Sequence, residues 1–156
     1  MSYPQRVYGR NLGYMQHRQG SGTLWGPLFG ARARDWADTW EGPQGWGTGV
    51  YEHVLTVANV EPGMTVLDCG CGAGRFVHLA AERGADVAGI DAAAELVEIA
   101  ASRTPGADLR AGDFEALPWP DGSVDVVTGF STFQFAHDQV RALGEARRVS
   151  RARCGW

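Results

Sequence analysis

A carboxylate and three closely spaced glycines are the residues best suited to hold a small molecule. Asp68 ends an apolar run, and Gly70, Gly72 and Gly74 follow it at alternate positions. A residue without a Cβ atom accepts a positive φ at low cost and lets backbone N–H groups approach a ligand. A strand that leads through such a turn into a helix is typical of sites for dinucleotides and other adenosine-bearing cofactors. We therefore predict a cofactor-binding turn at this point of the chain.

The spacing of the glycines favours one cofactor over another. The dinucleotide fingerprint is G-x-G-x-x-G, and it places a pyrophosphate at the N-terminus of the following helix. Here the third glycine comes one residue early, and Arg75 takes the place where the fingerprint has a small residue. The carboxylate of Asp68 would repel a pyrophosphate but would suit an amino-acid ammonium group. The turn therefore favours S-adenosylmethionine over NAD.

Two later acidic positions have the spacing that an adenosine cofactor needs. Asp91 ends the β-compatible run 85–91. A carboxylate about 20 residues after the glycine turn takes the ribose hydroxyls in such sites. Asp113 and Phe114 follow a third run, 107–112. This pair can offer a carboxylate to the adenine amine and an aromatic wall to its ring.

These residues require strands that end at one edge of a sheet, and the chain alternates strand-like with helix-like segments. The expected strands are the run that ends at Asp68 and the segments 85–91, 107–112 and 124–130; the expected helices are 76–83, 92–102 and 137–149. The last helix carries Val140, Leu143 and Ala146 at helical spacing. This alternation predicts an α/β fold with a parallel sheet flanked by helices.

Four motifs in this order resemble the class I S-adenosylmethionine-dependent methyltransferases, particularly the small-molecule branch that includes ubiquinone and menaquinone biosynthesis methyltransferases. The motifs are VLDCGCGAG (66–74), VAGID (87–91), GDFEALP (112–118) and SVDVV (123–127), and the resemblance runs from about residue 31 to residue 149. It implies a Rossmann-like sheet with strand order 3-2-1-4, a small-molecule methyl acceptor and S-adenosyl-L-methionine as cofactor.

The resemblance also implies a set of cofactor-binding residues. Asp68, Gly70 and Gly72 would contact the methionine portion, with Cys69, Cys71 and Gly74 in the same loop. Asp91 would hold the ribose, and Ala92, Asp113 and Phe114 would surround the adenine. Phe130 and Ser131 would face the methyl group that is transferred.

The carboxyl end departs from the family pattern. In the family, the last helix is followed by Leu-Lys/Arg-Pro-Gly-Gly and three further strands, whereas here the residues Ser150 to Trp156 follow. We therefore expect a sheet that lacks the family's last three strands, with 150–156 as an aberrant tail. The chain has no lysine and is rich in glycine and alanine, as the product of a GC-rich gene would be. A shifted reading frame in such a gene would produce a tail of this composition, and resequencing the coding DNA tests that hypothesis.

The amino-terminal third has no strand pattern and is rich in glycine and tryptophan. We expect residues 1–30 to be loosely ordered, because glycines punctuate them and no apolar period emerges. Helices are expected at 31–40 and 48–60, as a helical cap on the domain 31–149. Trp40, Trp46 and Tyr51 are expected either to line an acceptor pocket or to be simple core aromatics, with equal weight.

Composition limits the partners. The net charge of −4 gives no reason to expect nucleic acid or an anionic membrane, and no stretch approaches the roughly 20 apolar residues of a membrane span. The N-terminus lacks a signal-peptide pattern, so we expect a cytoplasmic protein. Cys69 and Cys71 lack the C-x-x-C spacing of a metal site, so no metal is expected. His137 is a candidate base, weighed against the favoured interpretation as an ordinary helix-start residue.

Three functions of different kinds follow. The first is an active methyltransferase for a small molecule, and the second is a truncated, inactive relative that only binds S-adenosylmethionine. The third is an NAD-type oxidoreductase, which the glycine spacing and Asp68 disfavour. Loss of the later strands would leave the fourth strand as an open edge, so we also expect poor solubility, a homodimer through that edge or a rearranged tail.

Overall fold

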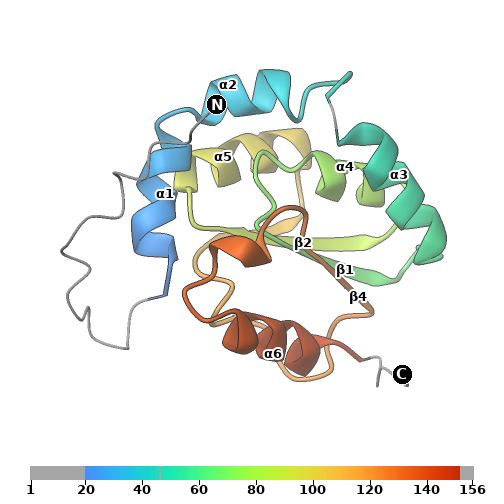
Figure 1. The fold of residues 1–156 in the computed structure, drawn as a ribbon. Coiled ribbons are helices and arrows are strands. Elements are labelled where there is room, and N and C mark those ends of the chain that lie inside the picture. Colours follow the sequence, from blue (N-terminus) through green and yellow to red (C-terminus); the bar gives the residue numbers. More distant parts are fainter. Residues whose placement is uncertain (1–19, 46, 152–156) are drawn as a thin grey trace, which may run out of the picture.

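The computed structural model describes residues 20–45 and 47–151, and a four-stranded parallel sheet lies at its centre. The strands are β1 (Thr65–Cys69), β2 (Asp86–Asp91), β3 (Asp108–Ala111) and β4 (Val126–Thr128). Their order is β3-β2-β1-β4, and each neighbouring pair is parallel (Figure 1). The predicted fold class and strand order are therefore confirmed.

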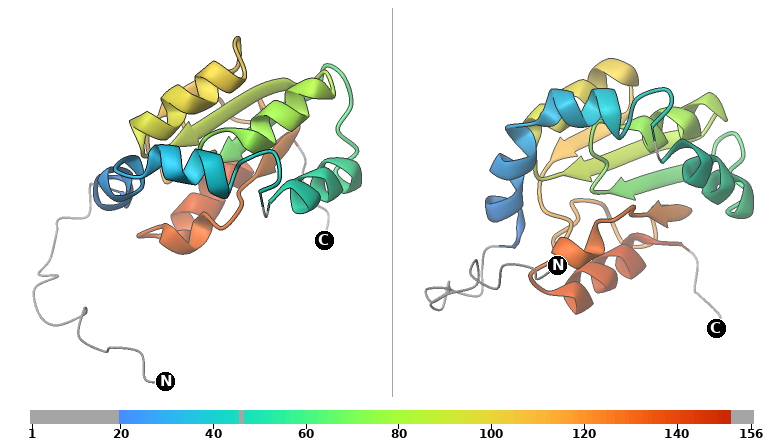
Figure 2. Two further views of the ribbon diagram at one scale, coloured as in Figure 1. Left: turned by 90° about the horizontal axis from the view of Figure 1, so that it is seen from above. Right: turned by 45° about the horizontal axis from the view of Figure 1, so that its top comes forward.

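Helices cover both faces of the sheet. They are α1 (Gly22–Gly30), α2 (Ala33–Thr39), α3 (Thr48–Val57), α4 (Arg75–Glu82), α5 (Ala94–Arg103) and α6 (Gln139–Val149), with a 3-10 turn η1 (Phe133–Phe135). Helices α4 and α5 lie on one face and α6 on the other (Figure 1). The second view in Figure 2 shows the carboxyl ends of the strands directed toward the side where α1 lies.

The central strand β1 is buried on both of its faces. Val66 packs with Leu55 and Phe76 in the cluster beneath α3 and α4. Leu67 and Cys69 point the other way, into the cluster that includes residues of α6. Side chains alternate along a strand, so Asp68 shares the face of Val66 and stands at the carboxyl end of the sheet.

Helix α1 corrects the expectation that residues 1–30 lack order. Residues 1–19 lie outside the described part of the chain, but 22–30 form a helix. Gly22, Gly26 and Gly30 recur every four residues on one face. A Cβ on Gly26 would lie 2.5 Å from the backbone oxygen of Ala92, so only glycine permits this close approach to the start of α5. The face of α1 that packs against the start of α5 is made of glycine. The sequence of this helix therefore shows no apolar period.

Helix α6 was predicted over 137–149; it begins two residues later, at Gln139, and ends at Val149 as predicted. Ala142 and Val149 are fully buried against the sheet, whereas Val140 is 83% and Leu143 54% exposed. Arg148 fixes this orientation, because its guanidinium bonds the backbone oxygens of Leu117 and Trp119 in the loop before β4. The helical spacing of Val140 and Leu143 is therefore confirmed, but both side chains face away from the core.

The segment after α6 runs beside β4. The backbone of Val124 accepts from Arg151 and donates to Val149, and a parallel bridge joins Val124 to Ser150. Asp125 also forms an ion pair with Arg151 at 2.8 Å. Within the described chain, the edge of β4 away from β1 has this single bridge, and the rest of the predicted aberrant tail, 152–156, lies outside the described residues.

Candidate functional site

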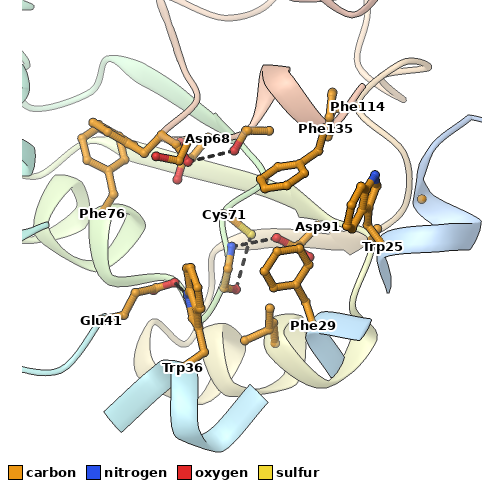
Figure 3. Close-up of a pocket in the computed structure, with 18 of the residues that line it drawn as sticks. Trp25, Phe29, Trp36, Glu41, Asp68, Cys71, Phe76, Asp91, Phe114 and Phe135 are labelled. Carbon is orange, nitrogen blue, oxygen red and sulfur yellow. Dashed lines mark hydrogen bonds between the residues drawn. The ribbon is translucent and has the colours of Figure 1, made fainter. Parts of the chain in front are cut away.

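One cavity of about 360 Å³ lies at the carboxyl ends of the strands, beneath α1 and α2 (Figure 3). Its volume is typical of a small-molecule site. Ten of the twelve predicted cofactor residues line it: Asp68, Gly70, Cys71, Gly72, Asp91, Ala92, Asp113, Phe114, Phe130 and Ser131. The cavity therefore brings together residues that were singled out from four separate stretches of sequence.

The other two predicted residues, Cys69 and Gly74, do not line the cavity and pack against other parts of the fold. The side chain of Cys69 is fully buried in the core beneath the sheet. Gly74 precedes α4 with φ of 81°, and a Cβ there would lie 2.6 Å from the Cβ of Ala100 on α5. Gly74 is thus required for the close packing of the turn against α5 rather than for contact with the cavity.

Asp68 stands at the end of β1 and is only 3% exposed. The hydroxyl of Thr128 on the neighbouring strand donates to its Oδ1 at 2.8 Å. Burial, reinforced by the negative charges of Glu41 and Asp91, raises the pKa of Asp68 to about 7. A cationic group in the cavity would restore its ionised form, so the site favours a ligand that carries one.

Asp91 ends β2 and fixes the glycine turn. Its Oδ2 accepts the N–H of Gly72 and its Oδ1 the N–H of Ala93, both at 2.9 Å. Burial raises the pKa of Asp91, while these backbone bonds favour its charged form. Each carboxylate oxygen has a second lone pair, so both can still accept a ligand hydroxyl.

Asp113 follows β3 and is shared with α1. Its Oδ1 accepts from the N–H of Glu115 at 2.9 Å, and its Oδ2 accepts from the N–H of Gly22 at 2.8 Å. Beside it, Phe114 packs edge-to-face on Phe133 with ring centroids 5.8 Å apart. The carboxylate and aromatic ring that were predicted to meet an adenine thus reach the cavity together with the first turn of α1.

Aromatic rings form much of the remaining wall. Trp25 of α1 packs on Phe135 with centroids 4.9 Å apart, and Tyr51 of α3 packs on Phe130 at 4.6 Å. Trp40, which was expected either to line a pocket or to lie in the core, stacks on Trp36 one helical turn earlier, with ring centroids 5.5 Å apart. Tyr51 and Trp40 line the cavity, which favours the pocket interpretation of both, and Trp46 lies outside the described residues. Burial raises the pKa of Tyr51, so its hydroxyl stays protonated.

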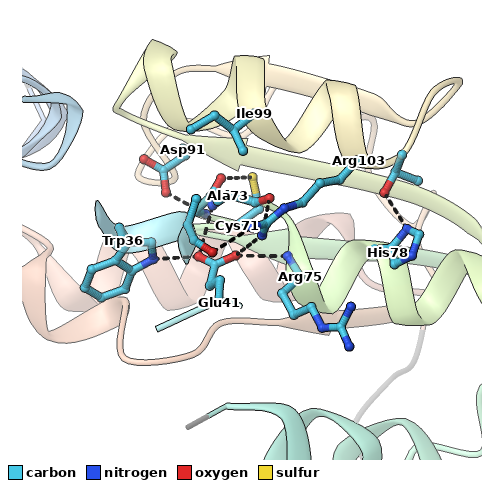
Figure 4. Close-up of polar contacts among 12 residues, drawn as sticks. Trp36, Glu41, Cys71, Ala73, Arg75, His78, Asp91, Ile99 and Arg103 are labelled. Carbon is cyan, nitrogen blue, oxygen red and sulfur yellow. Dashed lines mark hydrogen bonds and ion pairs between the residues drawn. The ribbon is translucent and has the colours of Figure 1, made fainter. Parts of the chain in front are cut away.

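Glu41 is one of the lining residues that the sequence did not indicate. It follows α2, is 6% exposed, and accepts the N–H of Ala73 with Oε1 and the N–H of Arg75 with Oε2, both at 2.9 Å (Figure 4). The indole N–H of Trp36 also donates to Oε1, at 2.6 Å. Burial raises the pKa of Glu41, while the donors around it favour the carboxylate form. An isolated acid between Trp40 and Gly42 has no periodicity that could have signalled this role.

The other candidates for chemistry lie elsewhere or are inert. His137 is exposed and outside the cavity lining, and only its backbone N–H is engaged, with Glu115. Burial raises the pKa of Cys69 and Cys71 well above the ordinary thiol value, so neither is a ready thiolate. The described residues contain no cluster of three or more His, Cys, Asp and Glu able to hold a metal. Their helices include none long and apolar enough to span a membrane.

The lining fits an adenosine cofactor with a cationic amino-acid group. Three carboxylates stand at the ends of β1, β2 and β3, a glycine turn exposes backbone near them, and aromatic rings cover the rest. Together with Glu41 the described lining holds four carboxylates and no cationic side chain. Such a surface suits an ammonium, a sulfonium or hydroxyls, and opposes a pyrophosphate.

Comparison with known proteins agrees with this geometry. The family model described as "Methyltransferase domain" matches residues 67–153. A malonyl-[acyl-carrier protein] O-methyltransferase of Serratia marcescens is 34% identical over 102 residues, which are 65% of this chain and 40% of that protein. A demethylmenaquinone methyltransferase of Renibacterium salmoninarum is 33% identical over 98 residues, or 63% of this chain and 41% of that protein.

Solved structures give the same result. A chain from the complex between the Haloferax volcanii Trm112 methyltransferase activator and the putative methyltransferase superposes with a TM-score of 0.66 and 30% identity. The superposition covers 79% of this chain and 54% of that one. The present chain thus spans about 40% of the length of the two curated relatives and about half of the matched structure.

Proposed function

The chain belongs to the methyltransferase-domain family of class I S-adenosylmethionine-dependent enzymes, and from this premise we propose that it methylates a small molecule with S-adenosylmethionine as cofactor. One observation supports this most strongly. The carboxylates of Asp68, Asp91 and Asp113 come from the ends of three neighbouring strands and line one aromatic cavity. In open α/β sheets, ligands bind in the crevice at the carboxyl ends of the strands.

Each carboxylate has a separate part in the proposal. Asp68 pairs with the ammonium of the cofactor, because it is buried and a cation would restore its charge. Asp91 accepts the ribose hydroxyls with the lone pairs that Gly72 and Ala93 leave free. Asp113 and Phe114 border the adenine. The bound cofactor would supply an electrophilic methyl group on a sulfonium.

The aromatic side chains position the reactants and exclude water. Rings near a sulfonium contribute about 1–2 kcal/mol of cation–π stabilisation in a dry site. Phe130 and Ser131 lie just past β4 and border the acceptor, together with Tyr51 and Trp40. His137 is not among the residues of this lining, so we assign the rate enhancement to positioning and desolvation rather than to a histidine base.

We propose an acceptor without negative charge. The names of the relatives refer to malonyl-[acyl-carrier protein] and to demethylmenaquinone as methyl acceptors of those proteins. The four carboxylates in the described lining would repel an acidic acceptor, whereas a neutral aromatic or an amine would meet rings and favourable charge. A neutral, ring-bearing small molecule therefore fits this wall better than a carboxylate.

We also propose that two copies pair through the free edge of β4. Val126–Thr128 bond β1 on one side, and in the described chain only the Val124–Ser150 bridge lies on the other. An open strand edge is a template for pairing with another chain.

Transfer of a labelled methyl group tests the proposed activity. The protein is incubated with methyl-labelled S-adenosylmethionine and matched panels of neutral aromatic, amine and carboxylate acceptors. We expect labelled product from the first two panels only, and its loss in an Asp91→Asn variant. Exclusive labelling of carboxylates would contradict the proposed acceptor class. Binding of cofactor without transfer to any panel would support a binding role alone.

A further inference from the structure

Glu41 occupies the place at which the helix after a glycine turn normally meets a phosphate. The first N–H groups of a helix have no partner within it, and together with the helix dipole they form an anion site. The N–H of Arg75, the first residue of α4, and the N–H of Ala73 in the turn just before it are both bonded by the two oxygens of one carboxylate. That carboxylate belongs to a segment 32 and 34 residues earlier in the sequence.

The surroundings of Glu41 complete an anion cradle. The indole N–H of Trp36 donates to Oε1, and the guanidinium of Arg103 lies 3.6 Å from Oε2. Arg103 is itself fixed, since it donates to the backbone oxygens of Ala73 and Ala37. Four donors from three parts of the fold therefore converge on one buried carboxylate (Figure 4).

We propose that Glu41 is a specificity-determining residue: a built-in anion that fills the phosphate position of the glycine turn and thereby restricts the cavity to cofactors without a pyrophosphate. The inference rests on the proposed cofactor and explains how a turn so close to the dinucleotide pattern rejects dinucleotides. A carboxylate in this place already accepts the hydrogen bonds of these donors. A phosphate would therefore find no free donor there and would be repelled by the negative charge of Glu41.

Removal of the carboxylate should uncover the site. In Glu41→Ala the N–H groups of Ala73 and Arg75, the indole of Trp36 and the charge of Arg103 remain, without their acceptor. Inorganic pyrophosphate should then bind at least about tenfold more tightly than to the wild-type chain, because charge-assisted hydrogen bonds to four donors become available. Acetate, which matches the missing carboxylate, should raise the melting temperature of this variant and leave that of the wild type unchanged.

Two variants keep the test decisive. Glu52→Ala makes the same change of charge at an exposed site on α3 and should bind pyrophosphate like the wild type. Glu41→Gln keeps the volume of the side chain, so this variant should remain folded even if Glu41→Ala does not. Its affinity for pyrophosphate should rise less than that of Glu41→Ala. A merely structural cap would lower the melting temperature of Glu41→Ala without any gain in pyrophosphate or acetate binding.

The experiment is calorimetric titration of all four proteins with inorganic pyrophosphate and, separately, with S-adenosylhomocysteine. Tighter pyrophosphate binding in both Glu41 variants supports the inference, and equal affinity in folded wild-type, Glu41 and Glu52 proteins overturns it. Failure of the wild type to bind S-adenosylhomocysteine would instead contradict the proposed cofactor, because the pyrophosphate titration does not depend on it.

Discussion

At the scale of single residues, the site is defined by carboxylates with different partners. Asp68 has one hydroxyl donor, and Asp91 accepts one N–H of the glycine turn and one at the start of α5. Glu41 accepts the N–H groups of Ala73 and Arg75, where the turn enters α4, and the indole N–H of Trp36. The carboxylate with the fewest donors is the one whose pKa rises to about 7. Burial without matching hydrogen-bond donors favours the neutral acid. Asp68 is therefore the carboxyl group whose ionisation a bound cation would change most.

The affinity for S-adenosylhomocysteine should depend on pH through Asp68. Between its ordinary pKa and about 7, the folded protein holds a proton that the unfolded chain has released, so this group stabilises the fold less as pH rises. The affinity for an ammonium group should instead increase as pH rises, because the ammonium pairs with the ionised form of Asp68. Affinity should rise about tenfold from about pH 6 to about pH 8. Calorimetric titration at several pH values measures this trend.

Asp68→Asn is the matched control for that prediction. It should bind more weakly, and its affinity should be nearly independent of pH, although Glu41 and Asp91 face the same cavity and remain in place. Equal pH trends in the wild type and in Asp68→Asn would show that Asp68 is not the titrating group.

At the scale of elements, the glycine turn and the packing of α1 position the site. Helix α1 brings the N–H of Gly22 to Asp113 and the ring of Trp25 to the cavity wall. It can do so because Gly26 lies against the backbone of Ala92, at the start of the α5 segment. Helix α1 therefore lines the cavity although it meets the start of α5 through glycine.

Substitution at Gly26 should loosen α1. In Gly26→Ala the new Cβ would lie 2.5 Å from the oxygen of Ala92, a backbone atom that cannot move aside. We expect the free energy of unfolding to fall by about 1–3 kcal/mol, as in other overpacked sites, together with weaker binding of S-adenosylhomocysteine. Urea denaturation and calorimetry measure the two effects.

Gly49→Ala is the control for that substitution. Gly49 lies in α3 with no atom within 4 Å of an added Cβ, so alanine there should stabilise the helix by up to about 1 kcal/mol. If Gly26→Ala were as stable as Gly49→Ala, the close packing of α1 would not matter for the fold.

Local patterns predicted the parts of the site that lie within single runs of sequence. Asp68, Asp91 and Asp113 each end a strand-like run, so their convergence follows from the parallel sheet. Glu41 could not be predicted, because the backbone N–H groups that it accepts, those of Ala73 and Arg75, are more than 30 residues away and no periodicity leads to it. The orientation of α6 depends on Arg148, whose partners lie in the loop before β4. Contacts between distant segments decide both features, and a local pattern does not contain them.

At the scale of the whole molecule, the four-stranded sheet has two different edges. β3 forms one edge, and β4 forms the other, where the described chain provides only the bridge at Ser150. β1 is buried on both faces at the centre of the sheet. The pairing that we propose would use the β4 edge, since an open strand edge is a template for a further strand.

Pairing through β4 predicts a dimer that forms with rising concentration. Val124 directs its backbone N–H and C=O toward Val149 and Arg151, and by alternation Val126 directs its own toward the open edge. Val126→Pro removes that donor and should yield a monomer, while Val126→Ala should still pair. Light scattering coupled to size-exclusion chromatography measures the mass. A wild-type monomer at every concentration would contradict the pairing.

The central claim is that the cavity is built for S-adenosylmethionine and not for a dinucleotide. Calorimetric titration of the wild-type protein with S-adenosylhomocysteine and, in a parallel experiment, with NADH tests it most directly. The three strand-end carboxylates and the buried Glu41 predict saturable binding of S-adenosylhomocysteine at one site per chain and no binding of NADH. Binding of NADH in preference, or of neither compound, would contradict the account.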